Sequence, residues 1–509
     1  MEDLDDNKNE TKNLLENEEN SGNYSDVKLE RISATTEQKI EGGKKVSSIQ
    51  TIFSIWNTMI GSSIVSIPYN VYNAGIIPTV IIGLLYGFIC YFTCSIVVKL
   101  GGKEEEFANV VYNYFNYGFG KKSAKVGKVL QITFNLMINT GATFVYFVII
   151  NQNLYPCLCL LLKAFNIDLN EEDLSPHFDK FSLFYCALIV GLLVFPLTIL
   201  KEMDFLVKFN SYGIYFVSSL LIFVIYNGIR TISNDNFHFE YKENVEGSKD
   251  RNLFLFGENI SILAGTLSLG LFCHSVILNL LKSNKIQENN QRDLFWGYFC
   301  VTMTYIIIGI MGYIGFSGSD FSSDFKDNWF QFYKSDNYFI LVLRVLNVIQ
   351  LISIFPILFF SVRKQLFMTF FESHLNKNIS IISFSVILLV LCLIVLYFCH
   401  NILGKLISFI GASTSLILIY TISPLTNMVY YYIRHQTKNE IDRKLAMMDS
   451  EDKKEDIFPD NIKNPVPLKP MKALFFYLSM MLIIVVGIIT FVLQFLPINF
   501  FKVKIEKNK

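Results

Sequence analysis

The sequence predicts an all-α polytopic membrane protein with about eleven transmembrane helices, in an inverted repeat of five plus five. Composition supports the membrane class, because 52% of the 509 residues are hydrophobic and only 17% are charged, whereas soluble domains carry about 25% charged residues. Apolar runs near the roughly 20 residues that cross a bilayer recur along the chain. Two of these runs, five spans apart, are interrupted by glycine and hydroxyl residues. Matching interruptions at this separation indicate two halves of opposite orientation.

The expected spans follow one another through most of the chain. They are residues 50–70, 76–99, 129–152, 182–200, 205–228, 259–281, 295–316, 338–361, 380–399, 402–422 and 473–496. A shorter segment at 105–120 is flanked by charged residues, and we expect it to form a helix at the membrane interface. These elements give a ten-span core over residues 46–430 and an eleventh span within residues 473–509.

Two polar regions flank the ten-span core. Residues 1–45 contain mainly Asn, Glu, Lys and Ser, which is a composition typical of disordered tails. Residues 431–472 form a long polar loop. Lys and Arg gather in the loops that would share a side with these two regions, so we expect both regions to be cytosolic. The chain would then end in a short exoplasmic tail.

The N-terminal tail carries two short sorting patterns. Residues 10–15 match an acidic dileucine signal, and residues 24–27 match a tyrosine-type signal. Such signals are addresses that cytosolic receptors read. We therefore expect the tail to bind a sorting adaptor or a regulatory complex, and the protein to reside in endolysosomal or vacuolar membranes rather than at the cell surface.

The composition argues against several other function classes. The formal net charge is zero, which provides no basic surface for nucleic acid. Most of the nine cysteines fall in or beside apolar runs, as small packing residues do, rather than in a disulfide framework. The six histidines are scattered without the spacing of a metal site, and the sequence contains no phosphate-binding loop. We expect neither an enzyme nor a bound cofactor, apart from a coupling ion.

The first span is interrupted at its middle by Asn57 and Thr58 and then by Gly61, Ser62 and Ser63. Glycine costs a helix interior about 1 kcal/mol relative to alanine, and Ser and Thr offer the backbone competing hydrogen bonds. An opened backbone is tolerated in hydrocarbon only where it is buried in protein or lines a cavity. The stretch therefore predicts a discontinuous helix at a substrate site, and the alternative is a packing surface for a neighbouring helix.

The sixth span repeats this pattern between Gly265 and His274. The carbonyl groups that we expect to be freed there are those of Ser268, Leu269, Gly270 and Leu271. His274 is an ionisable residue within a span and is therefore a candidate proton relay. Its alternative role, which we favour, is to cap the unwound segment by a hydrogen bond to a freed carbonyl.

Polar stripes follow one face of two other spans. In the third span the stripe is Gln131, Asn135 and Asn139, and in the eighth it is Asn347, Gln350 and Ser353. An amide that faces lipid lacks hydrogen-bonding partners, so these faces must point into the bundle or a cavity. Asn139 is a candidate substrate contact, with interhelical hydrogen bonding as the alternative. Arg344, at the outer end of the eighth span, is expected to snorkel toward water.

Residues 56–68, with the sequence WNTMIGSSIVSIP, closely resemble the first-helix motif of the amino acid/auxin permease family. The resemblance is greatest to the lysosomal, arginine-sensing branch of the sodium-coupled neutral amino acid transporters. The family's sixth-helix motif resembles Phe272, Cys273 and His274, and the end of its eighth helix resembles Pro356 followed by Arg363. The resemblance covers roughly residues 50–430.

The resemblance implies a LeuT-type fold and carrier activity toward amino acids. It also implies that sodium binds to a first-helix Asn, here Asn57, and to an eighth-helix hydroxyl, here Ser353. We therefore predict a secondary active transporter that works by alternating access. The first and sixth spans would rock against the third, fourth, eighth and ninth.

This prediction assigns a role to each candidate residue. The amides near Gly61, Ser62 and Ser63 would hold the substrate carboxylate, beside Thr58 and Asn139. The four freed carbonyls of the sixth span would hold its ammonium group. Sodium is favoured as the coupling ion over a proton relayed by His274. The partners would be an amino acid and membrane lipid, and the main alternative function is an amino acid sensor that signals through its N-terminal tail.

Overall fold

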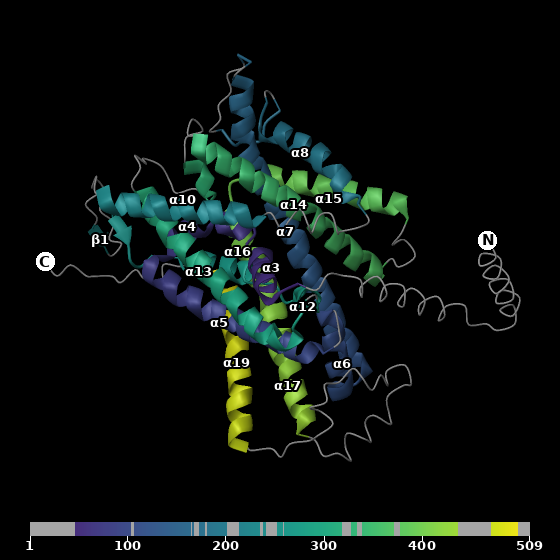
Figure 1. Ribbon diagram of the computed structural model, residues 1–509. Coiled ribbons are helices and arrows are strands. Elements are labelled where there is room, and N and C mark those ends of the chain that lie inside the picture. The colour runs from purple at the N-terminus through teal and green to yellow at the C-terminus, as the bar shows by residue number, and fades with distance from the viewer. Residues whose placement is uncertain are drawn as a thin grey trace, which may run out of the picture.

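The structure is a computed structural model in which almost all of the described residues lie in helices (Figure 1). The described residues are 46–102, 106–163, 165–166, 173–178, 181–200, 213–234, 238–240, 252–257, 259–282, 284–317, 327–332, 338–370, 377–435 and 470–496. The predicted tail at 1–45, with both sorting patterns, and most of the predicted loop at 431–472 lie outside these ranges.

The elements follow in chain order as two groups of spans. The first group is α3 (Ser48–Met59), η1 (Ser62–Val65), α4 (Ile67–Ala74), α5 (Ile76–Gly101), α6 (Phe107–Phe119), α7 (Lys121–Lys163), α8 (Leu183–Thr198) and α10 (Gly213–Asn234). A parallel pair of short strands follows, β1 (His238–Glu240) and β2 (Asn252–Phe254). The rest is α11 (Ser261–Gly270), α12 (Ile277–Lys282), η2 (Gln287–Asn289), α13 (Asn290–Ser317), η3 (Trp329–Phe332), α14 (Tyr338–Phe370), α15 (Asn378–Cys399), α16 (Leu403–Ile417), η5 (Leu418–Ile422), α17 (Ser423–Arg434) and α19 (Pro470–Val492).

The number of spans agrees with the expected number. Eight helices in the described part of the chain are long and apolar enough to cross a membrane. The shorter apolar helix α8 adds a ninth span, and the two interrupted helices, α3–η1–α4 and α11–α12, add the last two. The all-α class and the count of about eleven are confirmed.

Several boundaries differ from the expected ones. The fifth span, expected at 205–228, is α10 at 213–234, and residues 201–212 lie outside the described ranges. The third span, expected at 129–152, is part of the 43-residue helix α7. A helix continues into polar flanks as long as its backbone hydrogen bonds persist, so an apolar run marks only the part that faces lipid or core.

The first span is broken where the sequence predicts. Ser47 and Gln50 form a capping box that starts α3, and the last hydrogen bond of α3 joins the Ile60 amide to the Trp56 carbonyl at 3.1 Å. The next bond along the chain joins the Ile64 amide to the Gly61 carbonyl at 3.4 Å. The amides of residues 61–63 therefore lie between two hydrogen-bonded segments.

The sixth span is broken later than expected. α11 remains helical through Gly265 and ends at Gly270, and the unwound stretch is residues 271–276. Gly265 instead permits close helix packing, because a Cβ atom there would lie 2.2 Å from Ser408 Oγ. A Cβ atom on Gly411 of α16 would likewise lie 2.1 Å from the Gly265 carbonyl oxygen. Here the packing role of small residues applies, rather than helix breaking.

The remaining helices support this centre. The predicted segment at 105–120 is helix α6, which buries Phe107, Val111 and Tyr114 as it packs against α7 and α17. The eleventh span, α19, runs beside α17 at one end of the molecule (Figure 1). Tyr431 of α17 stacks there on Phe476 of α19, with ring centroids 4.2 Å apart.

Candidate functional site

The two helix breaks meet at a tyrosine that sequence reasoning missed. The Tyr305 hydroxyl of α13 lies 3.0 Å from the Met59 carbonyl oxygen, at the end of α3, and 3.4 Å from the Gly270 carbonyl oxygen, at the end of α11. Seven residues earlier on the same face of α13, the Tyr298 hydroxyl donates to the Leu271 carbonyl at 3.2 Å. Two phenols therefore hold the ends of both interrupted helices against α13.

A second tyrosine closes on the first break from α7. A Cβ atom on Gly61 would lie 2.1 Å from the Tyr146 hydroxyl oxygen and 3.1 Å from the ring carbon that bears it. Position 61 must therefore lack a side chain for the backbone to approach Tyr146 this closely. Ser63 is buried beside it, and Ser62 opens the short helix η1.

The other predicted substrate residues have the following positions. Thr58 is exposed, and its hydroxyl donates to the Ser54 carbonyl of its own helix at 2.7 Å. The Ser268 hydroxyl donates to the Ala264 carbonyl at 2.9 Å. The Leu269 carbonyl accepts from the Phe272 amide at 3.2 Å. The carbonyls of Gly270 and Leu271 face the two tyrosines of α13, so the structure brings these two of the predicted residues to the break.

Asn139 lies on α7 but away from the first break. Its Nδ2 atom donates to Ser361 Oγ of α14 at 3.4 Å, which is the interhelical hydrogen bond that the sequence offered as the alternative. Asn139 precedes Tyr146 by seven residues, or about 10 Å along the helix. It therefore lies between the break and the cavity described below.

The two predicted sodium ligands belong to one neighbourhood. A Cβ atom on Gly213, the first residue of α10, would lie 3.1 Å from Asn57 Oδ1 and 3.2 Å from Gln350 Cγ. The Ser353 hydroxyl donates to the Gln350 carbonyl at 2.6 Å, one turn along α14. The first, fifth and eighth spans thus meet around Gln350, which the sequence placed in a polar stripe but not in the site.

His274 lies in the unwound stretch and is fully buried. Its Nε2 atom is 2.9 Å from Thr93 Oγ1 of α5, and its ring stacks on Phe272 with centroids 5.6 Å apart. Within the described part of the chain, His274 Nδ1 has no hydrogen-bonding partner. His274 therefore contacts a side chain of the second span, whereas capping of a freed carbonyl was expected.

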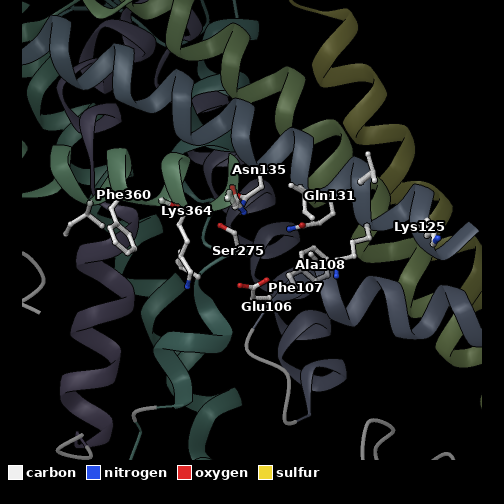
Figure 2. Close-up of a pocket in the computed structure, with 16 residues that line it drawn as sticks. Glu106, Phe107, Ala108, Lys125, Gln131, Asn135, Ser275, Phe360 and Lys364 are labelled. Carbon is white, nitrogen blue, oxygen red and sulfur yellow. The ribbon is translucent and has the colours of Figure 1, made fainter. Parts of the chain in front are cut away.

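The molecule is hollow at one end of α7. A cavity of about 570 Å³ lies beside Gln131 and Asn135, between α6, α7 and α14 (Figure 2). Ser275, from the unwound stretch of the sixth span, also lines it. Two residues of the predicted third-span stripe therefore face a cavity, as the argument from unsatisfied amides requires.

The other end of α7 is covered by residues 327–332, which we call the closing segment. Asn328 Nδ2 donates to Gln152 Oε1 at 3.0 Å and to Asn153 Oδ1 at 3.2 Å. Gln152 follows Gln131 by 21 residues, or about 30 Å of helix, which equals the thickness of a bilayer core. The bundle is therefore open on one side and covered on the other.

Two further contacts fix the closing segment. Arg344 Nη2 donates to the Phe330 carbonyl at 2.7 Å, and Arg344 is only 3% exposed. The expectation that Arg344 snorkels is wrong, because the side chain is buried against the short helix η3, which the sequence did not predict. Asp327 Oδ2 accepts from the Gly404 amide at 2.8 Å, and burial raises the pKa of this carboxyl above its ordinary value.

A comparison with protein families identifies this arrangement. The family described as transmembrane amino acid transporter protein matches residues 44–448. The chain belongs to this family. The match confirms the resemblance seen in the first-helix motif, and the matched proteins are transporters rather than enzymes.

Named relatives cover most of the chain. Neutral amino acid transporter 9 of Danio rerio is 28% identical over 440 residues, which cover 77% of each chain. The sodium-coupled neutral amino acid transporter 9 homolog of Caenorhabditis elegans is 26% identical over 76% of this chain and 68% of its own. Vacuolar amino acid transporter 2 of Saccharomyces cerevisiae is 22% identical over 76% of this chain and 78% of its own.

Solved structures confirm the LeuT-type fold. Mhp1 in an inward-facing conformation superposes with a TM-score of 0.53 at 11% identity, over 88% of this chain and 89% of its own. MhsT in complex with L-phenylalanine gives a TM-score of 0.50 at 12% identity, over 88% and 99%. This family member is therefore a multi-pass membrane protein built for transport across a membrane.

Proposed function

We propose that the protein is a secondary active transporter that moves amino acids by alternating access, driven by a sodium gradient. One observation carries the proposal. Two interrupted helices meet at Tyr305, between an end that is hollow at Gln131 and an end that is covered by Asn328. A site at mid-depth with one open side is what alternating access requires, since the substrate must reach one face of the membrane at a time.

The substrate would bind across the two breaks. The amides of residues 61–63 lie between hydrogen-bonded segments, where they would donate to a carboxylate. The Gly270 and Leu271 carbonyls, which already accept from tyrosines, each keep a second lone pair for an ammonium group. Donors on one side and acceptors on the other suit the zwitterionic backbone of an amino acid.

The coupling ion would bind next to the last turns of α3, just before the first break. Asn57 Oδ1 and the turn from Gln350 to Ser353 supply side-chain and main-chain oxygens near the start of α10. Sodium is a hard cation and needs about six oxygen ligands, and the carbonyl groups of an unwound backbone can supply several of them. The rival is a proton carried by His274, which contacts Thr93.

The test is uptake into proteoliposomes that contain the full-length protein. A panel of labelled L-amino acids identifies the substrate, and sodium and pH gradients are then imposed independently. We expect uptake that depends on a sodium gradient. Uptake that ignores sodium but follows an imposed pH gradient would transfer the coupling role to a proton, and no uptake of any amino acid would overturn transport itself.

We further propose an endolysosomal or vacuolar location with a cytosolic N-terminus. The name of the yeast relative, vacuolar amino acid transporter 2, supports a vacuolar site, and residues 10–15 carry the dileucine pattern. Leu14→Ala combined with Leu15→Ala should move the protein to the cell surface, whereas Leu29→Ala, outside both patterns, should not. An unchanged distribution of the double variant would remove the dileucine from the proposal.

The second candidate function is an amino acid sensor that signals through residues 1–45. The length and acidity of this tail favour it, because transport itself does not need such a segment. Deleting residues 1–45 should then leave uptake unchanged while abolishing capture of cytosolic regulatory proteins. Capture that is the same with and without the tail would count against sensing.

A further inference from the structure

The cavity between α6, α7 and α14 carries charges of both signs around a polar floor. Figure 2 shows Lys364 on one side of Ser275 and Glu106 and Gln131 on the other, with Asn135 next to Ser275. Its volume of about 570 Å³ lies within the roughly 300–1,000 Å³ of small-molecule sites. The cavity is therefore large enough for a whole amino acid.

Two buried amides point to a ligand that donates hydrogen bonds. Gln131 is 1% exposed and Asn135 is 3% exposed, and both line the cavity. Neither Gln131 Oε1 nor Asn135 Oδ1 accepts a hydrogen bond from any residue that the structure describes. A buried acceptor without a donor costs about 1–3 kcal/mol, so a donor group from a ligand would stabilise both.

Three lysines and one glutamate line the cavity, and none of the four has an ion-pair partner among the described residues. Lys364, from α14, and Glu106, from the start of α6, are two of them. Lys128, by contrast, is already engaged, because its Nζ donates to Asn109 Oδ1 at 2.9 Å and lies 5.6 Å from the centroid of the Tyr112 ring. Lys125 lies at the edge of the group in Figure 2, away from Ser275.

We propose that this cavity is a second binding site for the zwitterionic backbone of an amino acid. Lys364 binds the α-carboxylate, and Glu106 together with the amide oxygens of Gln131 and Asn135 binds the α-ammonium. A ligand of a single sign would leave one of the two opposite charges without a partner, whereas a zwitterion satisfies both. The assignment rests on the proposed function, because the ligand is the transported class of molecule.

The second site is separate from the helix breaks but is connected to them. Asn135 precedes Tyr146, which contacts the first break, by eleven residues or about 16 Å of helix. The backbone of one amino acid cannot reach both places, so two molecules bind at once. Ser275 lines the cavity, and Leu271, at the other end of the same unwound stretch, is held by Tyr298. A ligand in the cavity therefore contacts the segment that shapes the central site.

The test is the number of amino acids that the full-length protein binds in detergent. Equilibrium dialysis with a tritiated mixture of L-amino acids at saturation should give two molecules per chain. Lys364→Met, which removes the charge and keeps the length, should give one, and Gly61→Val should also give one. The double variant should bind none. Lys122→Met, an exposed lysine of α7 outside the cavity, is the matched control and should still give two.

A second variant and two competitors protect the test from misfolding. Glu106→Gln should also bind one molecule. In wild-type protein, the amino acid bound in the cavity should not be displaced by propionate or by ethylamine, because each of these carries only one of the two charged groups of the zwitterion. One molecule per wild-type chain, or unchanged binding in both cavity variants, would overturn the second site. Absence of uptake in proteoliposomes would instead overturn the proposed function, so the two failures are distinguishable.

Discussion

The hydroxyl of Tyr305 donates a hydrogen bond to the main-chain carbonyl of Met59 across 3.0 Å. Met59 is the last residue of α3 before the first break. The same hydroxyl is 3.4 Å from the carbonyl of Gly270, the last residue of α11. A side chain of the seventh span therefore sets the spacing between the two half-helices that form the candidate substrate site.

Tyr305→Phe should reduce the uptake efficiency of the transporter by about tenfold. The substitution keeps the buried ring but removes the oxygen that contacts both helix ends, and a buried carbonyl left without a donor costs about 1–3 kcal/mol. Uptake of the best substrate in proteoliposomes measures the effect. Tyr226→Phe, an exposed tyrosine of α10, is the control and should behave as wild type. Equal uptake by both variants would show that Tyr305 only packs.

Gly61→Val should abolish uptake while leaving expression and membrane insertion largely intact. A branched side chain at position 61 would occupy the space taken by Tyr146, whose hydroxyl lies 2.1 Å from a Cβ atom built there. Gly61→Ala should be impaired for the same reason. Adding Tyr146→Phe removes the closest atom and should restore part of the uptake of Gly61→Ala. Full uptake by Gly61→Val would remove the proposed site.

The sequence located the first break correctly because the cause is local. Gly61 and its neighbouring serines weaken a helix wherever it packs. The sixth break was placed too early because the role of Gly265 is decided by Ser408 and Gly411 on α16, which no local pattern reveals. The number of spans was also predictable from local sequence, because the length of an apolar run is a property of each segment alone.

The tyrosines of the site could not be found from the sequence. Tyr298 and Tyr305 lie in an apolar run, where a buried aromatic usually packs. The one signal in the sequence was their spacing of seven residues, which places both on one face of a helix and is consistent with a shared partner. Arg344 was misread because its acceptor, the Phe330 carbonyl, belongs to the short helix η3 in the connection between two spans. Contacts between a span and the segment that connects two spans depend on the complete fold.

Asn57→Ala should raise the sodium concentration needed for half-maximal uptake. The variant removes one oxygen near Gln350 and the start of α10, while the amides and carbonyls of the substrate site remain. Substrate affinity at saturating sodium should therefore change less than sodium affinity. The measurement is uptake at varied sodium and at varied substrate. If substrate affinity falls and the sodium requirement does not, Asn57 belongs to the substrate site instead.

Asp327 should make the stability of the closing segment depend on pH. Burial is the largest influence on its carboxyl and raises the pKa above the ordinary value of 3.8, against the lowering effects of the Gly404 amide, the Tyr69 hydroxyl and Lys405. A group whose pKa is higher in the folded state binds its proton more tightly there. Its stabilising contribution is therefore complete below about pH 3.8 and is lost as the pH rises through the folded-state pKa.

Asp327→Asn isolates this contribution. The amide is neutral at every pH and keeps an oxygen to accept from Gly404, so it resembles the protonated acid. The melting temperatures of the two proteins should agree at the acid end of the range, and the variant should become the more stable as the pH rises toward neutrality. Other titrating groups near this end, such as His400 and Asp173, are present in both proteins and cancel in the difference. If instead the melting temperature of the wild-type protein rises relative to that of the variant as the pH increases, the Gly404 amide and Lys405 outweigh burial. Asp327 would then hold the closing segment as an anion.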